Sequence, residues 1–198
     1  MKSQAPAQQL LEKRGSARAR DLRAAGLESA QIARLVQRGE LIQLTRGVYA
    51  LAKRVPSENE ALIVVAQRKP EGFFCLLTAL RFHGLTTQAP SEVWLGLGPG
   101  RHAPKLDWPP LRVVRYSGAG LVAGIEAHER DGVPLRVTSV ARTVVDCFKF
   151  RNKIGLDVAL EALAQVRRER RAGNDAIWQL AVELRMANVM RPYMEAMP

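Results

Sequence analysis

Residues 29–51 read SAQIARLVQRGELIQLTRGVYAL, and this stretch decides the fold of the N-terminal part of the chain. Its first half repeats apolar residues at three- and four-residue spacing, which is typical of one face of a helix, and Gly39 follows as a helix stop. Its second half contains two strand-like runs, 41–44 and 48–51, joined at a turn where Gly47 supplies a positive φ. The stretch therefore predicts a helix followed by a β-hairpin.

Two shorter helical patterns precede this stretch. The first covers residues 7–15, and the second covers residues 17–25 with Ser16 placed to cap its start. Ser29 is placed in the same way to cap the third helix. Three helices and a hairpin within residues 1–55 outline a winged helix-turn-helix, whose third helix enters the major groove while the hairpin lies along the backbone.

The net charge of the 198-residue chain points to an anionic partner. It contains 30 Lys and Arg against 19 Asp and Glu, which leaves a formal charge of +11. Residues 1–55 hold 11 of these cations and only 4 of the acids, so most of the excess lies in the predicted winged helix. A basic domain of this outline favours binding to double-stranded DNA.

The outward face of the third helix carries side chains that can read bases, because Gln pairs with adenine and Arg with guanine in the major groove. Arginines on the preceding helix and at the hairpin tip suit phosphates. A solvated helix face is the alternative explanation for each of them. The base-reading candidates are Ala30, Gln31, Arg34, Gln37 and Arg38, the phosphate candidates are Arg18, Arg20, Arg23 and Arg46, and Ser29 at the helix start completes the DNA-binding set.

A second domain is predicted over residues 56–198. Ser57 and Glu60 have the spacing of a capping box at the start of a new helix. The overall class is α+β, with the N-terminal winged helix followed by an α/β domain that has a mixed sheet and three terminal helices. Its expected elements are a helix at 75–82, strands at 92–97, 111–116, 124–128 and 135–137 with a turn at Asp131-Gly132, and helices after Ser139.

Three features of this second domain have ordinary structural explanations. Arg142 and Asp146, four residues apart on one helical face, are expected to pair and hold their helix against the sheet. His83, between a helix and Gly84, is expected to cap that helix. A basic cluster could either extend the DNA-binding surface or solvate a helix end, and it consists of Arg167, Arg168, Arg170 and Arg171.

No catalytic residue, cofactor or metal site is expected. The glycine-rich run at 96–100 resembles a phosphate-binding loop, but Pro99 has no amide to donate and no helix follows. Histidines are scattered, and Cys75 and Cys147 lie in apolar surroundings that favour buried thiols in a reducing compartment. No apolar run approaches the ~18 residues of a membrane span, so we expect a cytoplasmic protein without membrane contact.

Three stretches resemble one known family, the AbiEi antitoxins of type IV toxin–antitoxin operons. Residues 35–50 are similar to the N-terminal domain of that family. Residues 77–85 (LTALRFHGL) and 137–146 (VTSVARTVVD) are similar to its C-terminal domain. The three stretches occur in the family's order and together span most of the chain.

The resemblance implies a function that composition and spacing do not. It implies a repressor that binds inverted repeats in its own promoter, and an antidote to an AbiEii-like nucleotidyltransferase toxin without a stable antitoxin–toxin complex. In the family the third helix and wing contact DNA, which here points to Gln31, Arg34, Arg38 and Arg46. We expect a monomer in solution, with cooperative binding to DNA left open. A stand-alone ligand-responsive transcription factor and a nucleic-acid-processing enzyme remain the alternatives.

Overall fold

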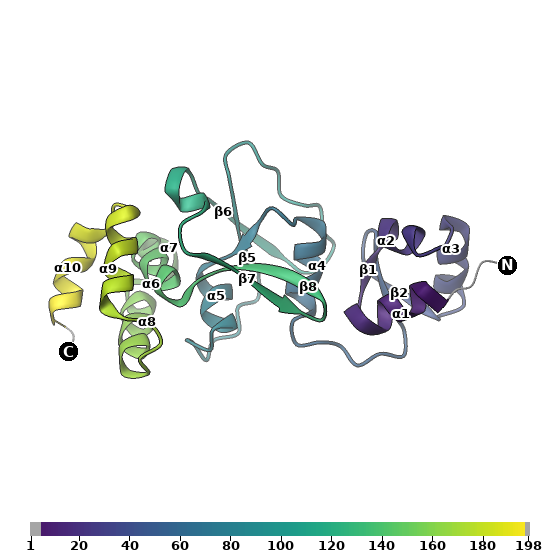
Figure 1. Ribbon diagram of the computed structural model, residues 1–198, viewed down its shortest axis with the longest axis horizontal. Helices are drawn as coiled ribbons and strands as arrows, with labels where there is room; N and C mark the ends of the chain where they lie inside the picture. The colour runs from purple at the N-terminus through teal and green to yellow at the C-terminus, as the bar shows by residue number, and fades with distance from the viewer. Residues whose placement is uncertain (1–4, 197–198) are drawn as a thin grey trace. The chain divides into compact units, whose positions relative to one another are not determined.

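The computed structural model describes residues 5–196, and the chain divides into two compact units (Figure 1). Among the described residues, the first unit contains 5–71, 103–110 and 128–135, and the second contains the remainder. This division passes through the hairpin of strands β7 (Ile125–Arg130) and β8 (Val133–Thr138). The predicted boundary between residues 55 and 56 stays a prediction.

The first unit contains the predicted three helices and hairpin. Its strands form an antiparallel sheet in the order β1-β3-β2, in which the short β1 adds to the hairpin of β2 and β3. This arrangement confirms the helix-turn-helix with a wing. The elements are α1 (Ala5–Arg14), β1 (Ala17–Arg18), α2 (Ala19–Ala24), α3 (Ser29–Gln37), β2 (Leu41–Thr45), β3 (Val48–Leu51) and α4 (Glu60–Arg68).

Apolar faces of α1, α2 and α3 meet in one core with the start of β2. Leu11, Leu22 and Ile32 are buried there, and Leu35 and Val36 pack against it. Gly39 follows α3 with a φ of 70°, a left-handed conformation that glycine adopts without steric cost, so the chain can turn directly into β2. The periodicity of the sequence therefore predicted the buried side of α3 correctly.

The expected caps of α2 and α4 are wrong. Ser16 is buried, and its carbonyl and hydroxyl oxygens accept hydrogen bonds from Nε2 of Gln67 at 2.9 and 3.3 Å. Residue 17 then enters β1, so α2 begins two residues later than predicted. At α4, Glu60 forms an ion pair with Arg54, and the Ser57 hydroxyl accepts from the amide of Asn59 at 3.2 Å.

The remaining strands form a mixed five-stranded sheet in the order β6-β5-β4-β8-β7. β5 runs parallel to β6, β4 runs parallel to β8, and β4 is antiparallel to β5. The two-residue β4 was not predicted, because so short a strand leaves no periodic pattern. The elements are β4 (Phe73–Phe74), α5 (Leu76–Phe82), β5 (Val93–Leu97), β6 (Leu111–Arg115), the 3-10 turn η1 (Gly118–Leu121), β7 (Ile125–Arg130) and β8 (Val133–Thr138).

Up to residue 196, where the described part of the chain ends, five helices rather than the three expected follow the sheet and lie beside one another (Figure 1). Helices α8 and α9 both pack on α6, which is buried along almost its whole length. None of the helices in residues 5–196 is long and apolar enough to cross a membrane. The helices are α6 (Val140–Lys149), α7 (Arg151–Ile154), α8 (Leu156–Arg168), α9 (Asn174–Glu183) and α10 (Ala187–Ala196).

Arg142 and Asp146 form the predicted ion pair, and it is completely buried in the second unit. Nε of Arg142 lies 2.9 Å from Oδ1 of Asp146, and both side chains are 0% exposed. The guanidinium also donates to the carbonyls of Gly120 and Ala123, and Tyr116 donates its hydroxyl to Oδ2 of Asp146 at 2.9 Å. Every member of the cluster binds within the fold, which supports a structural role.

Candidate nucleic-acid interface

The start of α3 fixes one of the predicted base-reading residues. The N-cap is Glu28 and not Ser29, and Glu28 and Gln31 form a reciprocal capping box. In this box Oε1 of Gln31 accepts a hydrogen bond from the amide of Glu28 at 2.8 Å. The Gln31 side chain is therefore engaged in capping the start of the helix, while Ser29 and Ala30 in the first turn are exposed.

The middle and end of α3 present the other predicted base-reading side chains to solvent. Arg34, Gln37 and Arg38 are all exposed. Nη1 of Arg38 lies 3.9 Å from Glu40, yet its side chain is 69% exposed, so this surface pair is worth at most about 1 kcal/mol. These three residues are available to a groove of DNA without loss of internal contacts that stabilise the fold.

The three arginines predicted on the second helix differ from one another, and Arg18 lies in β1 just before α2, not on the helix. Arg18 binds both carboxylate oxygens of Asp21 and donates to the carbonyl of Gln67 at 2.9 Å. Partial burial alone would raise the pKa of Asp21, but the bonds and charges of Arg18 and Arg20 hold it below its ordinary value. The Arg18 side chain is only 22% exposed, against 65% for Arg20. The Arg18 side chain therefore binds within the protein and stabilises the fold, whereas Arg20 and Arg23 are exposed to solvent.

The tip of the wing carries Arg46 in an exposed position. Gly47 beside it has a φ of 78°, and a Cβ at this glycine would lie 3.2 Å from Nη1 of Arg68. The buried Thr45 hydroxyl accepts a hydrogen bond from the amide of Asp107 at 3.1 Å, within the same unit. The turn is thus held at its base while the Arg46 side chain extends from it.

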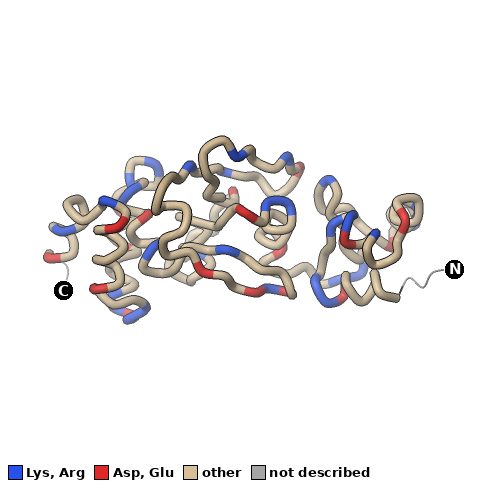
Figure 2. The backbone as a smooth tube through the Cα atoms, turned by 45° about the horizontal axis from the view of Figure 1, so that its top comes forward, with Lys and Arg blue, Asp and Glu red and all other residues tan. Residues whose placement is uncertain are grey.

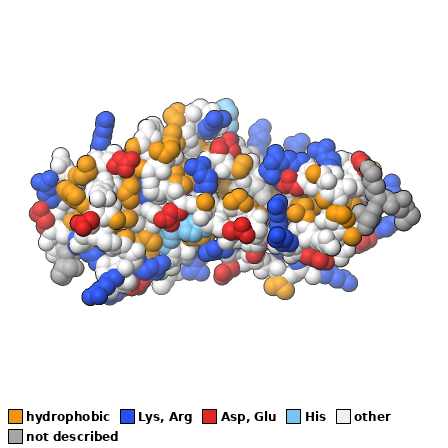
Figure 3. Space-filling view, in the orientation of Figure 1, with side chains coloured by type: hydrophobic (Ala, Val, Ile, Leu, Met, Phe, Trp, Pro, Cys, Tyr) orange, Lys and Arg blue, Asp and Glu red, His pale blue; other side chains and the backbone are white. Residues whose placement is uncertain are grey.

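Basic and acidic residues are unevenly distributed over the first unit, and the basic ones predominate. Lys and Arg occur along α1, α2, α3 and the wing, with a few acidic residues among them (Figure 2). On the face drawn in Figure 3, basic side chains gather over part of the N-terminal unit. This distribution matches the excess of cations in residues 1–55.

The basic cluster at the end of α8 is partly engaged within the second unit. Arg167 donates to Oδ1 of Asn174 and to the carbonyl of Met194, both at 2.9 Å. Arg171 donates to the carbonyl of His83 at 3.0 Å. Arg168 and Arg170 are exposed. His83 itself occupies the C-cap of α5, as expected, and its Nε2 lies 2.7 Å from the carbonyl oxygen of Thr138.

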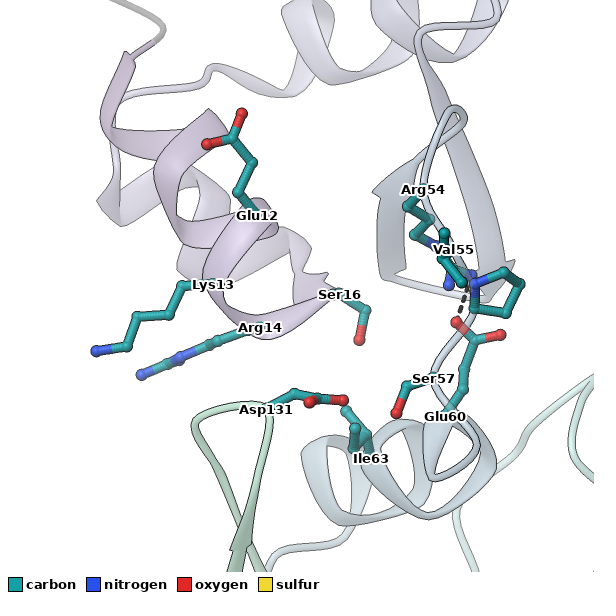
Figure 4. A pocket seen from close by; sticks show the side chains of 12 residues that line it. Glu12, Lys13, Arg14, Ser16, Arg54, Val55, Ser57, Glu60, Ile63 and Asp131 are labelled. Carbon is teal, nitrogen blue, oxygen red and sulfur yellow. Dashed lines mark ion pairs between the residues drawn. The ribbon is translucent and has the colours of Figure 1, made fainter.

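Two hollows of the first unit differ in chemistry. The one in Figure 4, of about 340 Å³, has basic and acidic walls that include Lys13, Arg14 and Asp131, and the Arg54–Glu60 ion pair lies within it. The other, of about 310 Å³, flanks α3 and includes Gln43 and Tyr49 of the wing strands. Neither residue was among the DNA-binding residues expected from the sequence, although the alternation of side chains along strands could have placed both on one face of the sheet.

The described residues bring together no group of three or more His, Cys, Asp and Glu that could hold a metal ion. Cys75 and Cys147 are buried free thiols, and burial raises the pKa of each above its ordinary value. Such thiols are poor nucleophiles.

Residues 7–52 match the model of a family described as transcriptional regulators, AbiEi antitoxin. These residues form an AbiEi-family domain. The match covers the helix-turn-helix and wing, so the AbiEi domain contains α3 and Arg46, and its family is one of transcriptional regulators. No curated protein matches the sequence of the chain.

A protein from Mycobacterium tuberculosis, RV2827C, has a similar crystal structure. The TM-score is 0.65 at 14% sequence identity, and the similarity covers 92% of this chain and 73% of that one. The likeness extends well beyond the AbiEi domain. At this identity it describes the fold alone.

Proposed function

We propose that the protein is an AbiEi-type antitoxin that represses its own operon by binding inverted repeats in the promoter, and that it neutralises an AbiEii-like nucleotidyltransferase toxin. The observation that carries the proposal is the joint exposure of Arg34, Gln37 and Arg38 on the third helix of an AbiEi-family domain. Because the third helix of a winged helix enters the major groove, these side chains would meet base edges.

The structure refines the roles that we propose for the individual residues. Arg34, Gln37 and Arg38 read bases, and Arg20, Arg23 and Arg46 bind phosphates. Gln31 and Arg18 act through the fold, because the first caps α3 and the second binds Asp21 and Gln67. Arg168, Arg170 and Arg171 are the exposed members of the basic cluster at the end of α8. We assign a second phosphate contact to Arg168 and Arg170, because Arg171 donates to the carbonyl of His83.

Titration of DNA tests the first half of the proposal. Full-length protein is titrated against a duplex of its own promoter and against a scrambled duplex of the same length. Wild-type protein should prefer the promoter. Arg34→Ala should lose about 1–3 kcal/mol on the promoter and much less on the scrambled duplex, because a base contact contributes only where its base is present.

Arg81→Ala is a matched control, since Arg81 is an exposed arginine on α5 in the second unit. It removes the same charge and should leave the preference unchanged. Equal losses on both duplexes for Arg34→Ala would remove this residue from the base-reading set. Failure of the wild type to bind either duplex at low ionic strength would overturn the repressor role.

Co-expression tests the antitoxin half. A neighbouring gene for a nucleotidyltransferase-like toxin is expressed with the full chain or with a form that lacks residues 1–55. We expect both forms to restore growth, which would place the antidote activity in residues 56–198, and we expect no stable complex on gel filtration. Continued toxicity with the full chain would refute the antitoxin role and favour a stand-alone regulator acting in the cytoplasm.

A further inference from the structure

The hollow beside α3 differs from the rest of the proposed DNA-binding surface because no charged residue lines it. Four of its lining side chains bear a hydroxyl or an amide, and they are Ser29, Gln37, Gln43 and Tyr49. Within the described part of the chain, the side chains of Gln43 and Tyr49 make no hydrogen bond to another residue. These polar groups are therefore available to a bound molecule.

The hollow lies between the third helix and the wing. Gln43 of β2 and Tyr49 of β3 are cross-strand partners, so both belong to one face of the sheet. Ser29 and Gln37 come from α3, two turns apart, and line the opposite side. Apolar residues of α3, including Ile32 and Val36, and Ala19 at the start of α2 complete the lining. A ligand in the hollow would touch the helix and the hairpin together.

The shape of B-DNA indicates what occupies this position, if the protein binds DNA as proposed. The major groove is about 12 Å wide and is bounded on each side by a sugar-phosphate backbone. When α3 is in that groove and the wing follows the next part of the duplex, one backbone has to pass between them. The group presented to the hollow is then a phosphate and not a base edge.

Neutral hydroxyl and amide donors are common partners of DNA phosphates. A hydrogen bond from such a donor to a charged oxygen is stronger than one to a neutral acceptor. Exposed cations of the same domain, Arg34 on α3 and Arg46 on the wing, would supply the long-range attraction. The donors of the wing strands, Gln43 and Tyr49, would instead fix the position of the DNA strand.

We infer that the hollow binds a single backbone phosphate of the operator through the side chains of Gln43 and Tyr49. This inference rests on the proposed function and assigns to the wing strands a contact separate from the cation at their tip. It makes Gln43 and Tyr49 positioning residues on DNA, without a role in choosing the base.

Methylphosphonate substitution tests the inference, because it replaces one charged phosphate oxygen with a methyl group. Promoter duplexes are prepared with one such substitution at each successive position, and binding is measured for wild type, Tyr49→Phe and Gln43→Ala. Each variant should bind the unmodified promoter about tenfold more weakly. On one modified duplex that loss should shrink below about twofold, because the partner oxygen is already absent.

The salt dependence separates this contact from those of the arginines. Neutral donors release no counterion of their own, so both variants should keep the wild-type slope of log affinity against log salt. Tyr193→Phe on α10 and Gln179→Ala on α9 are matched controls in the second unit, and they should bind as wild type does.

Equal losses for the two variants on every modified duplex would refute the inference, and so would affinities equal to wild type. A changed base preference in either variant would refute it as well, because it would make the residue a base reader. Each of these results presupposes that wild type binds the promoter. Absence of wild-type binding would instead refute the proposed function.

Discussion

Arg142→Met offers a sharp test of the buried cluster in the second unit. The substitution removes the guanidinium but keeps a long apolar side chain, so the space is largely filled. Asp146, which is 0% exposed, keeps only the hydroxyl of Tyr116 among the partners described above. Removing one member of a buried ion pair costs about 3–5 kcal/mol, because the other charge is left without compensation. That is a large part of the ~5–15 kcal/mol that stabilises a typical domain.

The pH dependence of the free energy of unfolding shows whether the uncompensated charge is the carboxylate of Asp146. Burial raises the pKa of Asp146 above its ordinary value, while the charge of Arg142 and the bonds from Arg142 and Tyr116 act to lower it. A carboxyl whose pKa is raised by folding stabilises the native state below its unfolded pKa, and this contribution is lost as the pH rises through the folded pKa. Without Arg142 the pKa of Asp146 rises further, so the variant should be weakest at high pH and recover as the pH falls.

Urea unfolding of the full chain, followed by circular dichroism at pH 8 and pH 5, measures both effects. With a denaturant slope of about 2 kcal/mol/M, the expected loss at pH 8 lowers the midpoint by roughly 2 M. The loss at pH 5 should be clearly smaller. Arg142→Met combined with Asp146→Asn removes the titrating group, and its stability relative to wild type should depend much less on pH. A loss for Arg142→Met that is equal at both pH values would refute the reasoning.

Three further predictions concern the wing, a helix cap and the thiols. Arg46→Ala should lower the slope of log affinity against log salt by about one unit, because it removes one phosphate contact. The change should be the same on promoter and scrambled duplexes. An unchanged slope would show that the wing tip does not touch the DNA backbone. Glu28→Ala should destabilise the protein by about 1 kcal/mol in thermal unfolding, because the variant loses the cap of α3. Glu12 is exposed on α1, and Glu12→Ala should leave the stability unchanged. Cys75 and Cys147 should react with a thiol reagent only after unfolding, since both are fully buried; rapid labelling of native protein would contradict the core described for the second unit.

Periodicity predicted much of the fold because the long elements repeat their apolar residues regularly. The inward face of α3, the hairpin at Gly47 and the turn at Asp131-Gly132 are all as expected. The helix caps were predicted less well, since a cap depends on which polar group reaches which amide. Ser16 had the right residue type for a cap, but the buried Gln67 binds it, 51 residues away in the sequence. Such a distant partner leaves no local signal.

In the proposed interface, too, the features that depend on neighbouring residues could be predicted, and those that depend on distant parts of the chain could not. Helical spacing was sufficient to place Arg34, Gln37 and Arg38 on the outer side of α3, because exposure follows from the period alone. It could not show which edge of that helix faces the sheet, so Gln43 and Tyr49 were not anticipated. This difference matters for affinity, because salt weakens the contacts made by cations but leaves neutral donors largely unaffected. If Gln43 and Tyr49 hold a phosphate, operator binding at physiological salt depends on residues that a count of charges does not reveal.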